Sequence, residues 1–520
     1  MARLHEFQGK ALLAQHKIPT PRGRAAATPA EARAIAEEIG APVMVKMQAW
    51  VTGRAGMGGI KKAANPEEAA AAASQMLGRR VKNFTVDWVL VEEQVQIERE
   101  FYAGVIVDDV SQSPVMIFSS VGGTGIEEIA VEFPDKVARA TIDIVRGLQD
   151  YQARDLARRA GIQGKLLNKL AGTLVRLWQT ARDIEARAAE INPLVLTADG
   201  TLLAADCRVT VDDYAVFRHK ELGIEIAREM DRPPTDLERI AYAVEANDYR
   251  GTFFFLQMAE DFIKGDKVVG FHGAGGGGSM MSMDAVLGQG YKLANFVDTS
   301  GNPPASKVYR AARIILSQPG LDGYFGSGSG VASQEQFHSA RGLAKAFLEE
   351  PLTVPAVIRL GGNAEDQAVE ILERVNGFVP APVEGYKKDD SPDYCAERLD
   401  SLVTGYSPPT AKERPAGRRT PPAEKPYRFA TVTGGTVTLD HARCATCESK
   451  VCIEACARGI LSLNEAGLPV LNITREEAKK GRCVECLGCD IECFFHGKQG
   501  GFVDLPIEGL EAHREKVGIG

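Results

Sequence analysis

The first part of the chain alternates between two hydrophobic periods, one typical of helices and one typical of buried strands. Apolar residues recur at helical spacing over residues 4–13, and a second helix is predicted from Thr28 to Ile39, ending at Gly40. Continuous apolar runs over residues 42–47 and 88–93 predict buried strands. This part of the chain is therefore predicted to be a mixture of helices and strands.

Between residues 240 and 390, predicted strands and helices follow one another regularly. Residues 267–278 are a strand followed by a glycine turn that opens a helix, which is the outline of a phosphate loop. Such alternation predicts a parallel, doubly wound sheet. The other elements are strands at 294–298, 324–330 and 357–363 and a helix at 307–316.

Residues 405–425 lack this periodicity and are rich in proline and charge, which predicts an extended linker. Arg414, Arg418 and Arg419 would be solvated there, or would form a docking patch. Beyond the linker, two short apolar runs flank the turn at residues 464–467 and predict a small hairpin.

Composition narrows the class of protein. The 520 residues are 44% hydrophobic, as in ordinary globular proteins, and suggest three or four domains. A net charge of -8 gives no electrostatic reason to expect nucleic acid or an anionic membrane as a partner. No apolar run reaches the roughly 20 residues that span a bilayer, and no secretory signal opens the chain, so we expect a cytoplasmic protein.

Cysteines are concentrated near the carboxyl end. Of the ten, only Cys207 and Cys395 precede residue 440, and a cluster of this kind in a cytosolic protein indicates metal rather than disulfides. The other eight have the spacings C-x2-C-x4-C-x3-C and C-x2-C-x2-C-x3-C, the second of which matches the bacterial ferredoxin pattern.

In that pattern the fourth cysteine of each group ligates the other [4Fe–4S] cluster. One cluster is therefore predicted on Cys444, Cys447, Cys452 and Cys493, and the other on Cys456, Cys483, Cys486 and Cys489. Zinc is the alternative, because paired C-x2-C units also form Zn(Cys)4 sites. Zinc does not require the third and fourth cysteines of each group at these spacings, so iron–sulfur clusters are favoured.

Candidate phosphate-binding residues follow the first buried strand. Lys46 lies within that strand, where a buried ammonium needs an anion. A glycine-rich loop over residues 53–61 comes next, and its glycines let backbone N–H groups approach phosphates closely, with Arg54 and Lys61 supplying charge. The alternative for the loop alone is a surface hairpin.

A predicted hairpin at residues 190–206 places oxygen side chains on neighbouring strands. Glu190, Asn192 and Asp206 would converge there, and hard oxygen ligands beside a phosphate loop suit Mg²⁺. The alternative is an exposed polar sheet face.

These motifs, together with the opening residues 4–10, resemble in kind and order the ATP-grasp β subunit of succinyl-CoA synthetases, through about residue 390. The resemblance implies that Lys46, Gly53 and Arg54 bind the phosphates of ATP or GTP, and that Glu92 and Glu100 seat the adenine and ribose. It also implies that Asn192 and Asp206 bind Mg²⁺.

The resemblance further implies an NDP-forming acyl-CoA synthetase, in which NTP phosphorylates a histidine and the phosphohistidine then activates a small carboxylic acid for attack by CoA. The histidine and the CoA site would belong to a partner α subunit, with no catalytic residue in this chain. His272, in an apparent packed turn, and His338, in a helix, are interpreted as structural. The family's helix N-terminus near the phosphohistidine would begin here at residues 328–334, where Ser333 and Gln334 replace the usual arginine.

The cysteine-rich end resembles two-cluster ferredoxin-like domains of electron-transfer subunits. The predicted fold is thus α/β and α+β: an ATP-grasp domain (1–235), a flavodoxin-like ligase domain (236–395), a linker (396–428) and a ferredoxin-like domain (429–520). Thioester formation moves no electrons, so a redox partner is expected. Two alternatives are an ATP-driven electron-transfer subunit and a ligase tethered to an oxidoreductase by its ferredoxin-like domain.

Overall fold

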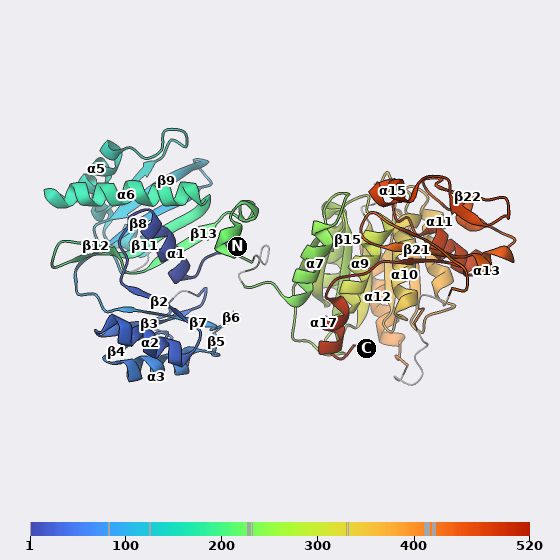
Figure 1. Ribbon diagram of the computed structural model, residues 1–520, viewed down its shortest axis with the longest axis horizontal. Coiled ribbons are helices and arrows are strands. Elements are labelled where there is room, and N and C mark those ends of the chain that lie inside the picture. The colour runs from blue at the N-terminus through green and yellow to red at the C-terminus, as the bar shows by residue number, and fades with distance from the viewer. Residues whose placement is uncertain are drawn as a thin grey trace. The chain divides into compact units, whose positions relative to one another are not determined.

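A computed structural model describes residues 2–51, 53–81, 84–123, 126–225, 230, 232–328, 330, 332–409, 417–418 and 423–519. The chain folds into two compact units, Met1–Pro234 and Thr235–Gly520 (Figure 1). Of the helices described, none combines the length and the apolar character needed to cross a membrane.

The smaller sheet of the first unit is antiparallel, in the order β2-β7-β3-β4, and the helices α2 and α3 pack on it. Local signals set the starts of both helices, because Thr28 and Asn65 accept hydrogen bonds from the N–H groups of Glu31 and Glu68, and a proline follows each cap. Gly40 ends α2 with a φ of 65°. The elements are β2 (Gly23–Ala26), α2 (Pro29–Ile39), β3 (Val43–Gln48), β4 (Ile60–Ala63), α3 (Pro66–Met76), β5 (Arg80–Val81), β6 (Phe84–Thr85) and β7 (Trp88–Glu93).

The larger sheet of the first unit has the order β1-β13-β11-β8-β9-β10, with β12 paired to β11. Helices α1, α5 and α6 share its hydrophobic core. The elements are β1 (Ala2–Arg3), α1 (Glu6–Gln15), β8 (Ile97–Asp108), β9 (Ser113–Ser119), α4 (Ile126–Glu132), η1 (Pro134–Lys136), β10 (Val137–Thr141), α5 (Asp150–Arg159), α6 (Lys165–Asp183), β11 (Ala186–Thr197), β12 (Leu202–Ala204), β13 (Cys207–Val211), η2 (Val216–Arg218) and η3 (Lys220–Leu222). Asp206 lies in the bend between β12 and β13 rather than on a strand.

The second unit is built on a six-stranded sheet in the order β14-β16-β15-β17-β18-β19, parallel except for β14. Counted along the chain, the parallel strands have the order 2-1-3-4-5, which is the flavodoxin-like arrangement. The predicted doubly wound sheet is confirmed. The elements are α7 (Asp236–Ala246), β14 (Phe254–Gln257), β15 (Val268–Ala274), α8 (Gly276–Gly288), β16 (Lys292–Asp298), α9 (Ala305–Leu316), β17 (Gly323–Gly328), α10 (Phe337–Glu349), β18 (Ala356–Arg359), α11 (Glu365–Val375), β19 (Val383–Tyr386) and α12 (Pro392–Gly405).

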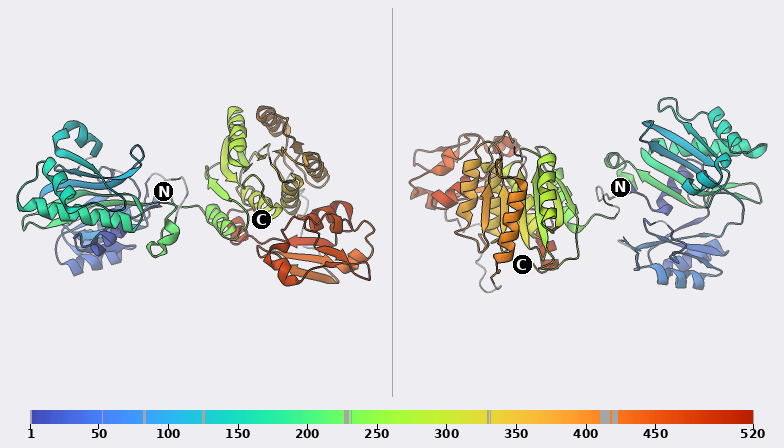
Figure 2. Two further views of the ribbon diagram at one scale, coloured as in Figure 1. Left: turned by 90° about the horizontal axis from the view of Figure 1, so that it is seen from above. Right: turned by 180° about the vertical axis from the view of Figure 1, so that it is seen from behind.

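The cysteine-rich end packs side by side with this sheet's helices (Figures 1 and 2). It contains the three-stranded sheet β20-β21-β24 and the predicted small hairpin, β22-β23. One continuous core includes Tyr324 and Phe347 of the doubly wound part and Val437 and Ile491 of the cysteine-rich part. The elements are β20 (Pro426–Ala430), β21 (Thr436–Asp440), α13 (His441–Ala445), α14 (Val451–Glu454), β22 (Leu461–Leu463), β23 (Pro469–Leu471), α15 (Arg475–Glu477), η4 (Ala478–Arg482), η5 (Gly488–Glu492), α16 (Cys493–His496), β24 (Gly501–Asp504) and α17 (Leu510–Lys516).

The predicted linker differs from the structure in two respects. Residues 396–405 belong to α12, which starts after the Ser391 cap, and residues 426–428 belong to β20, so the linker begins later and ends earlier than predicted. Arg418 is neither solvated nor part of a docking patch, because its guanidinium is ion-paired to buried Asp490 and lies over the rings of Phe494 and Phe502. Arg414 and Arg419 lie outside the described residues.

Candidate functional sites

Three cations and three carboxylates form a buried charge cluster in the first unit. The Nζ of Lys46 on β3 lies 2.9 Å from Glu6 Oε1 and 2.7 Å from Glu92 Oε1. Arg54 Nη1 lies 2.9 Å from Glu6 Oε2, and Arg54 Nη2 lies 2.7 Å from Asp206 Oδ2. Lys10 Nζ completes the set at 2.5 Å from Glu92 Oε2. Lys46 therefore has the anions that its burial requires.

The pairing favours the charged forms of Lys46 and Glu6, whereas burial, reinforced by Glu6, raises the pKa of Asp206 to about 6. Burial on its own would lower the pKa of Lys46, but Glu6 and Glu92 outweigh it and raise that pKa above its usual value. Burial would likewise raise the pKa of Glu6, but Lys10, Lys46 and Arg54 hold it well below its usual value. A preorganised set of cations is thus held against the sheet.

Glu6 and Lys10 are site residues that sequence reasoning missed. They stand four residues apart on α1, and both are buried. The sequence did contain a signal for these two residues, namely a glutamate and a lysine four residues apart on an otherwise apolar helix face. Glu92 was predicted to seat adenine and ribose. The structure shows both of its carboxylate oxygens in ion pairs, and its contact with nucleotide stays a prediction.

The remaining predicted nucleotide and Mg²⁺ residues have separate local partners. Asn192 Oδ1 accepts a hydrogen bond from the N–H of Gly123 at 3.0 Å. If Gly123 carried a side chain, its Cβ would lie 2.4 Å from Glu100 Oε2. Glu100, Gly123 and Asn192 are therefore neighbours. The N–H of Asn192 donates to the carbonyl oxygen of Asp206 at 3.1 Å. Glu190, in contrast, accepts the Tyr102 hydroxyl at 3.0 Å.

The glycine-rich loop begins as expected, and one of its two cations is paired elsewhere. Gly53 has a φ of 72°, a left-handed conformation that suits glycine. Lys61 lies on β4, where its ammonium donates to Gln75. Arg54, in the same loop, is the cation that reaches the buried cluster.

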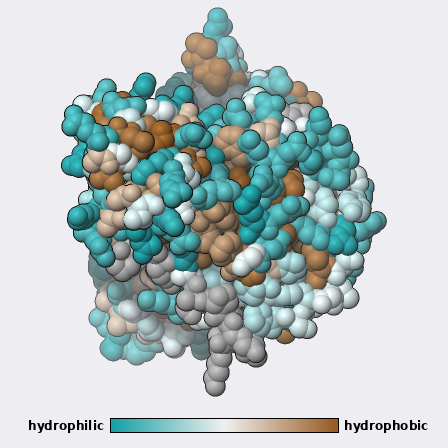
Figure 3. Space-filling model, turned by 90° about the vertical axis from the view of Figure 1, so that its right-hand side faces the viewer, coloured by the Kyte–Doolittle hydropathy of each residue, from teal (hydrophilic) through white to brown (hydrophobic). Residues whose placement is uncertain are grey.

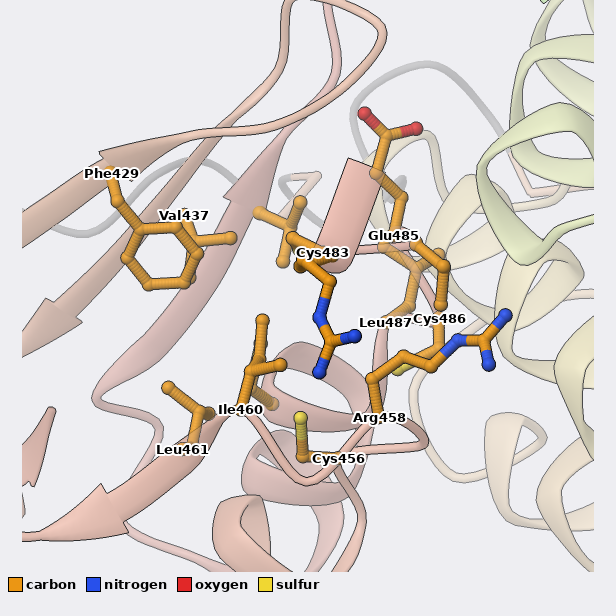
Figure 4. A pocket seen from close by; sticks show the side chains of 14 residues that line it. Phe429, Val437, Cys456, Arg458, Ile460, Leu461, Cys483, Glu485, Cys486 and Leu487 are labelled. Carbon is orange, nitrogen blue, oxygen red and sulfur yellow. The ribbon is translucent and has the colours of Figure 1, made fainter. Parts of the chain in front are cut away.

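Each predicted set of four cysteines lines a single cavity. Cys444, Cys447, Cys452 and Cys493 line one cavity. Cys456, Cys483, Cys486 and Cys489 line the other, with apolar neighbours such as Phe429 and Ile460 (Figure 4). The fourth cysteine of each sequence group, Cys456 or Cys493, thus lies at the other group's cavity. We call these the first and second cysteine cavities.

The thiols within each cavity influence one another. Burial, reinforced by the neighbouring Cys486, raises the pKa of Cys483 to about 12, and burial with Cys493 and Cys452 nearby does the same for Cys444. All ten cysteines are free of disulfides. Over the part of the chain that the structure describes, no three His, Cys, Asp or Glu side chains surround a position for a single metal ion. A [4Fe–4S] cluster is wider than one ion, so cysteines that hold one stand around it rather than meeting at a point.

The two histidines of the second unit occupy packed positions. His272 lies within strand β15, not in a turn, and its Nδ1 is 2.6 Å from the Tyr324 hydroxyl. Burial lowers the pKa of His272 to about 3. His338 lies in α10, as expected, and burial lowers its pKa to about 4.

The helix expected to begin at residues 328–334 is α10, and it begins at Phe337. Gln334 precedes it and is buried, with its side-chain amide donating to the carbonyl of Pro303 at 2.7 Å. Asn302 donates to the Ser333 hydroxyl at 3.1 Å. Ser329 and Val331 lie outside the described residues.

Comparison with known proteins shows that most of the buried charge cluster lies within a known family domain. The family model for the ATP-grasp domain matches residues 3–196, the part that carries most of that cluster. The fold resembles the solved ATP citrate lyase from Methanothrix soehngenii in complex with citrate and coenzyme A, with a TM-score of 0.62 and 17% identity, covering 78% of this chain and 100% of that one. The fold is thus that of a multidomain protein with an ATP-grasp domain.

Two relatives show which protein family this chain belongs to. The β subunit of the GDP-forming succinate–CoA ligase of Thermus thermophilus is 40% identical over 371 residues, covering 71% of this chain and 93% of that protein. The β subunit of the ADP-forming enzyme of Deinococcus radiodurans is 38% identical over 377 residues, covering 72% and 93%. This chain belongs to the family of succinate–CoA ligase β subunits, which are acid–thiol ligases.

Proposed function

We propose that this chain is the nucleotide-binding β subunit of an NDP-forming acyl-CoA synthetase and that its carboxyl end carries two [4Fe–4S] clusters. The reaction converts a small carboxylic acid, CoA and ATP or GTP into acyl-CoA, NDP and phosphate. A phosphohistidine on a partner α subunit relays the phosphoryl group, and that subunit also holds CoA. The buried cluster of Lys46, Arg54 and Asp206 in a member of this family carries the ligase part of the proposal.

In this proposal the residues of the first unit bind and orient the nucleotide. Lys46 and Arg54 turn from their carboxylate partners toward the phosphates, and the loop at Gly53 lets the backbone approach them. Glu92 and Glu100 seat the adenine and ribose. The anionic partners Glu6 and Asp206 keep the cations in place before nucleotide arrives.

The donor set near Asp206 fits Mg²⁺. Asp206 offers a carboxylate and Asn192 an amide oxygen, both hard oxygen ligands, and the hydrogen bond between their backbones keeps them adjacent. Bound there, Mg²⁺ would neutralise phosphate charge during transfer.

The cysteine cavities fit the clusters. Four cysteine sulfurs, which are soft ligands, line each cavity, and Glu485 at the second cavity already accepts hydrogen bonds from Thr431 and Thr433. The crossing of Cys456 and Cys493 is the arrangement of two-cluster ferredoxin-like domains. The clusters would supply one-electron transfer. The single observation that carries this part of the proposal is that each predicted ligand set lines one cavity.

Isolation of the native complex under anoxic conditions tests the proposal. We expect an α-like subunit to copurify, with NDP and phosphate released in the presence of CoA and a carboxylic acid. Absence of an α-like subunit would overturn the ligase assignment. The clusters are tested by measuring iron and acid-labile sulfide and by recording the EPR spectrum of the dithionite-reduced protein. Stoichiometric zinc instead of iron would overturn the cluster assignment.

A second candidate function is coupling between the clusters and the ligase, and packing within the second unit favours it. Helix α10 of the doubly wound part contacts the segment that carries Cys486, Cys489 and Cys493. Cluster-free cysteine-to-serine variants separate the alternatives. Unchanged acyl-CoA synthesis would exclude obligatory coupling, and retained synthesis with loss of an oxidoreductase partner would favour a tether.

A further inference from the structure

Three acidic residues lie in the segment 483–493, which carries four of the predicted cluster ligands. Each of the three is paired with a cation from helix α9 or α10 of the doubly wound part. The doubly wound part therefore supplies a counter-charge to every carboxylate of this segment. The pairs, with the distance from nitrogen to oxygen, are Arg310 with Glu485 at 3.6 Å, Lys345 with Asp490 at 2.8 Å and Arg341 with Glu492 at 2.8 Å.

One of these pairs, Arg310 with Glu485, borders the second cysteine cavity. Glu485 is among the residues that line that cavity, and its side chain is fully buried, while that of Arg310 is 7% exposed. The hydroxyls of Thr431 and Thr433 donate hydrogen bonds to the Glu485 carboxylate. In Figure 4 this carboxylate points away from the labelled cysteines. Glu485 is thus a buried negative charge at the second cavity, and Arg310 is its cation.

Arg310 acts on Glu485 through its charge. The 3.6 Å between Arg310 Nη1 and Glu485 Oε2 is longer than a hydrogen bond. Arg310 Nη2 is buried and has no hydrogen-bond partner among the residues that the structure describes. Burial strengthens the interaction of the two charges, because the protein interior screens them less than water does.

Two further cations line the second cysteine cavity, and both are exposed. They are Arg458 and Arg482. The side of the unit that carries α13 and the β22–β23 hairpin is largely hydrophilic, with hydrophobic residues in small groups (Figure 3). Water and dissolved salt screen charges at such a surface. The buried charge of Arg310 is therefore screened less than the charges of these two arginines.

Reduction adds one electron to an iron–sulfur cluster, so nearby positive charge raises its reduction potential and nearby negative charge lowers it. We propose that Arg310 tunes the potential of the second cluster, the one predicted in the second cysteine cavity. By offsetting the charge of Glu485, Arg310 raises that potential. Because Arg310 belongs to the doubly wound part, the redox chemistry of the cysteine-rich part depends on the part that it packs against. The inference rests on the proposed clusters.

The test is an anoxic redox titration of the intact, cluster-loaded chain, with dithionite as the reductant and EPR as the readout. The signal that is lost in Cys483→Ala identifies the second cluster. We expect Arg310→Gln to lower the ratio of reduced to oxidised second cluster about tenfold at a given solution potential, which equals about 59 mV for one electron. Glu485→Gln should shift the potential of the same cluster in the opposite direction, because it removes the negative charge.

Two variants and one change of conditions serve as controls. Arg313→Gln removes another buried arginine of α9, and it should leave both potentials unchanged, because the carboxylates paired with Arg313 do not line the cysteine cavities. Arg310→Lys keeps the positive charge and should restore most of the parent potential. The shift in Arg310→Gln should persist at high salt, since the pair is buried.

Iron content separates this inference from the cluster assignment. If the parent protein contains no clusters, the proposed function fails and the inference fails with it. With clusters present, an unchanged or raised potential in Arg310→Gln would overturn the tuning role, as would an equal shift in Arg313→Gln or a shift that vanishes at high salt. If Arg310→Gln does not retain its second cluster, Glu485→Gln decides, and an unchanged or lowered potential there would overturn the inference.

Discussion

Lys345 and Asp490 form an ion pair in which neither side chain is exposed to solvent, with 2.8 Å between Lys345 Nζ and Asp490 Oδ2. Lys345 lies on α10 of the doubly wound part, and Asp490 lies between Cys489 and Cys493, one from each predicted ligand set. Asp490 also accepts hydrogen bonds from Arg418 and from the N–H of Val503. The chain segment shared by both cysteine cavities is thus anchored to the ligase-like part through one buried carboxylate.

Replacement of Lys345 should therefore destabilise the second unit. We expect Lys345→Gln to lower the free energy of unfolding by about 3 kcal/mol, because it removes a partner from a buried carboxylate. Denaturant unfolding under anoxic conditions measures this, and iron content should fall with it. Lys516→Gln is the control, since its pair with Asp236 is exposed and should contribute little. Equal effects of the two substitutions would contradict the role given to the buried pair.

The crossing of the cysteine ligands can be tested one residue at a time. Cys493→Ala should abolish the same EPR signal as Cys444→Ala, and Cys456→Ala the same signal as Cys483→Ala. Iron should drop from about eight to about four atoms per chain in each case. Cys395→Ala, at a buried position of α12 outside both cavities, should leave iron unchanged. If Cys493→Ala instead removed the signal lost in Cys483→Ala, the ligands would not cross.

Lys46 should be required for nucleotide binding. Lys46→Met removes a buried cation that the proposal directs at phosphate, and such a loss costs about 3 kcal/mol, or roughly a hundredfold in Kd. Isothermal titration with ATP and GTP in the presence of Mg²⁺ measures the change. Lys62→Met, at an exposed position on β4, is the matched control and should bind nucleotide normally. Wild-type affinity in Lys46→Met would contradict the site.

His272 should make the protein less stable in acid. Its pKa is lowered to about 3 in the folded state, below the value of about 6.5 expected when unfolded. At a pH between these two pKa values, the unfolded chain binds a proton that the folded chain does not bind. The free energy of unfolding therefore falls as the pH falls from about 6.5 towards 3. Lowering the pH from 7 to 5 should reduce the free energy of unfolding by about 2 kcal/mol through His272.

His272→Asn should remove this contribution, so that the free energy of unfolding declines less between pH 7 and pH 5 than in the parent protein. Denaturant unfolding at the two pH values measures the difference. The same steepness in both proteins would show that His272 is not held neutral by burial. The same variant tests whether His272 is the phosphorylated histidine of the reaction. We expect acyl-CoA synthesis to persist in His272→Asn, because the phosphohistidine is expected on the partner α subunit.

Features encoded over short stretches were predictable. Helix α2 follows from its apolar period, its Thr28 cap and Gly40, and the doubly wound sheet follows from the regular change of period. The two sets of four cysteines that line single cavities were predictable as well, because ligand spacing in a short loop restricts which sulfurs can face one centre.

The sequence by itself thus determined the elements, their alternation and the residue types available for chemistry. The tertiary structure decided which charges meet. Glu6 reaches Lys46 and Arg54, Arg418 reaches Asp490, and His272 is buried in a strand rather than placed in a turn. No local period encodes such pairs, because a buried ion pair depends on the desolvation and distance that arise only when segments far apart in the chain pack together.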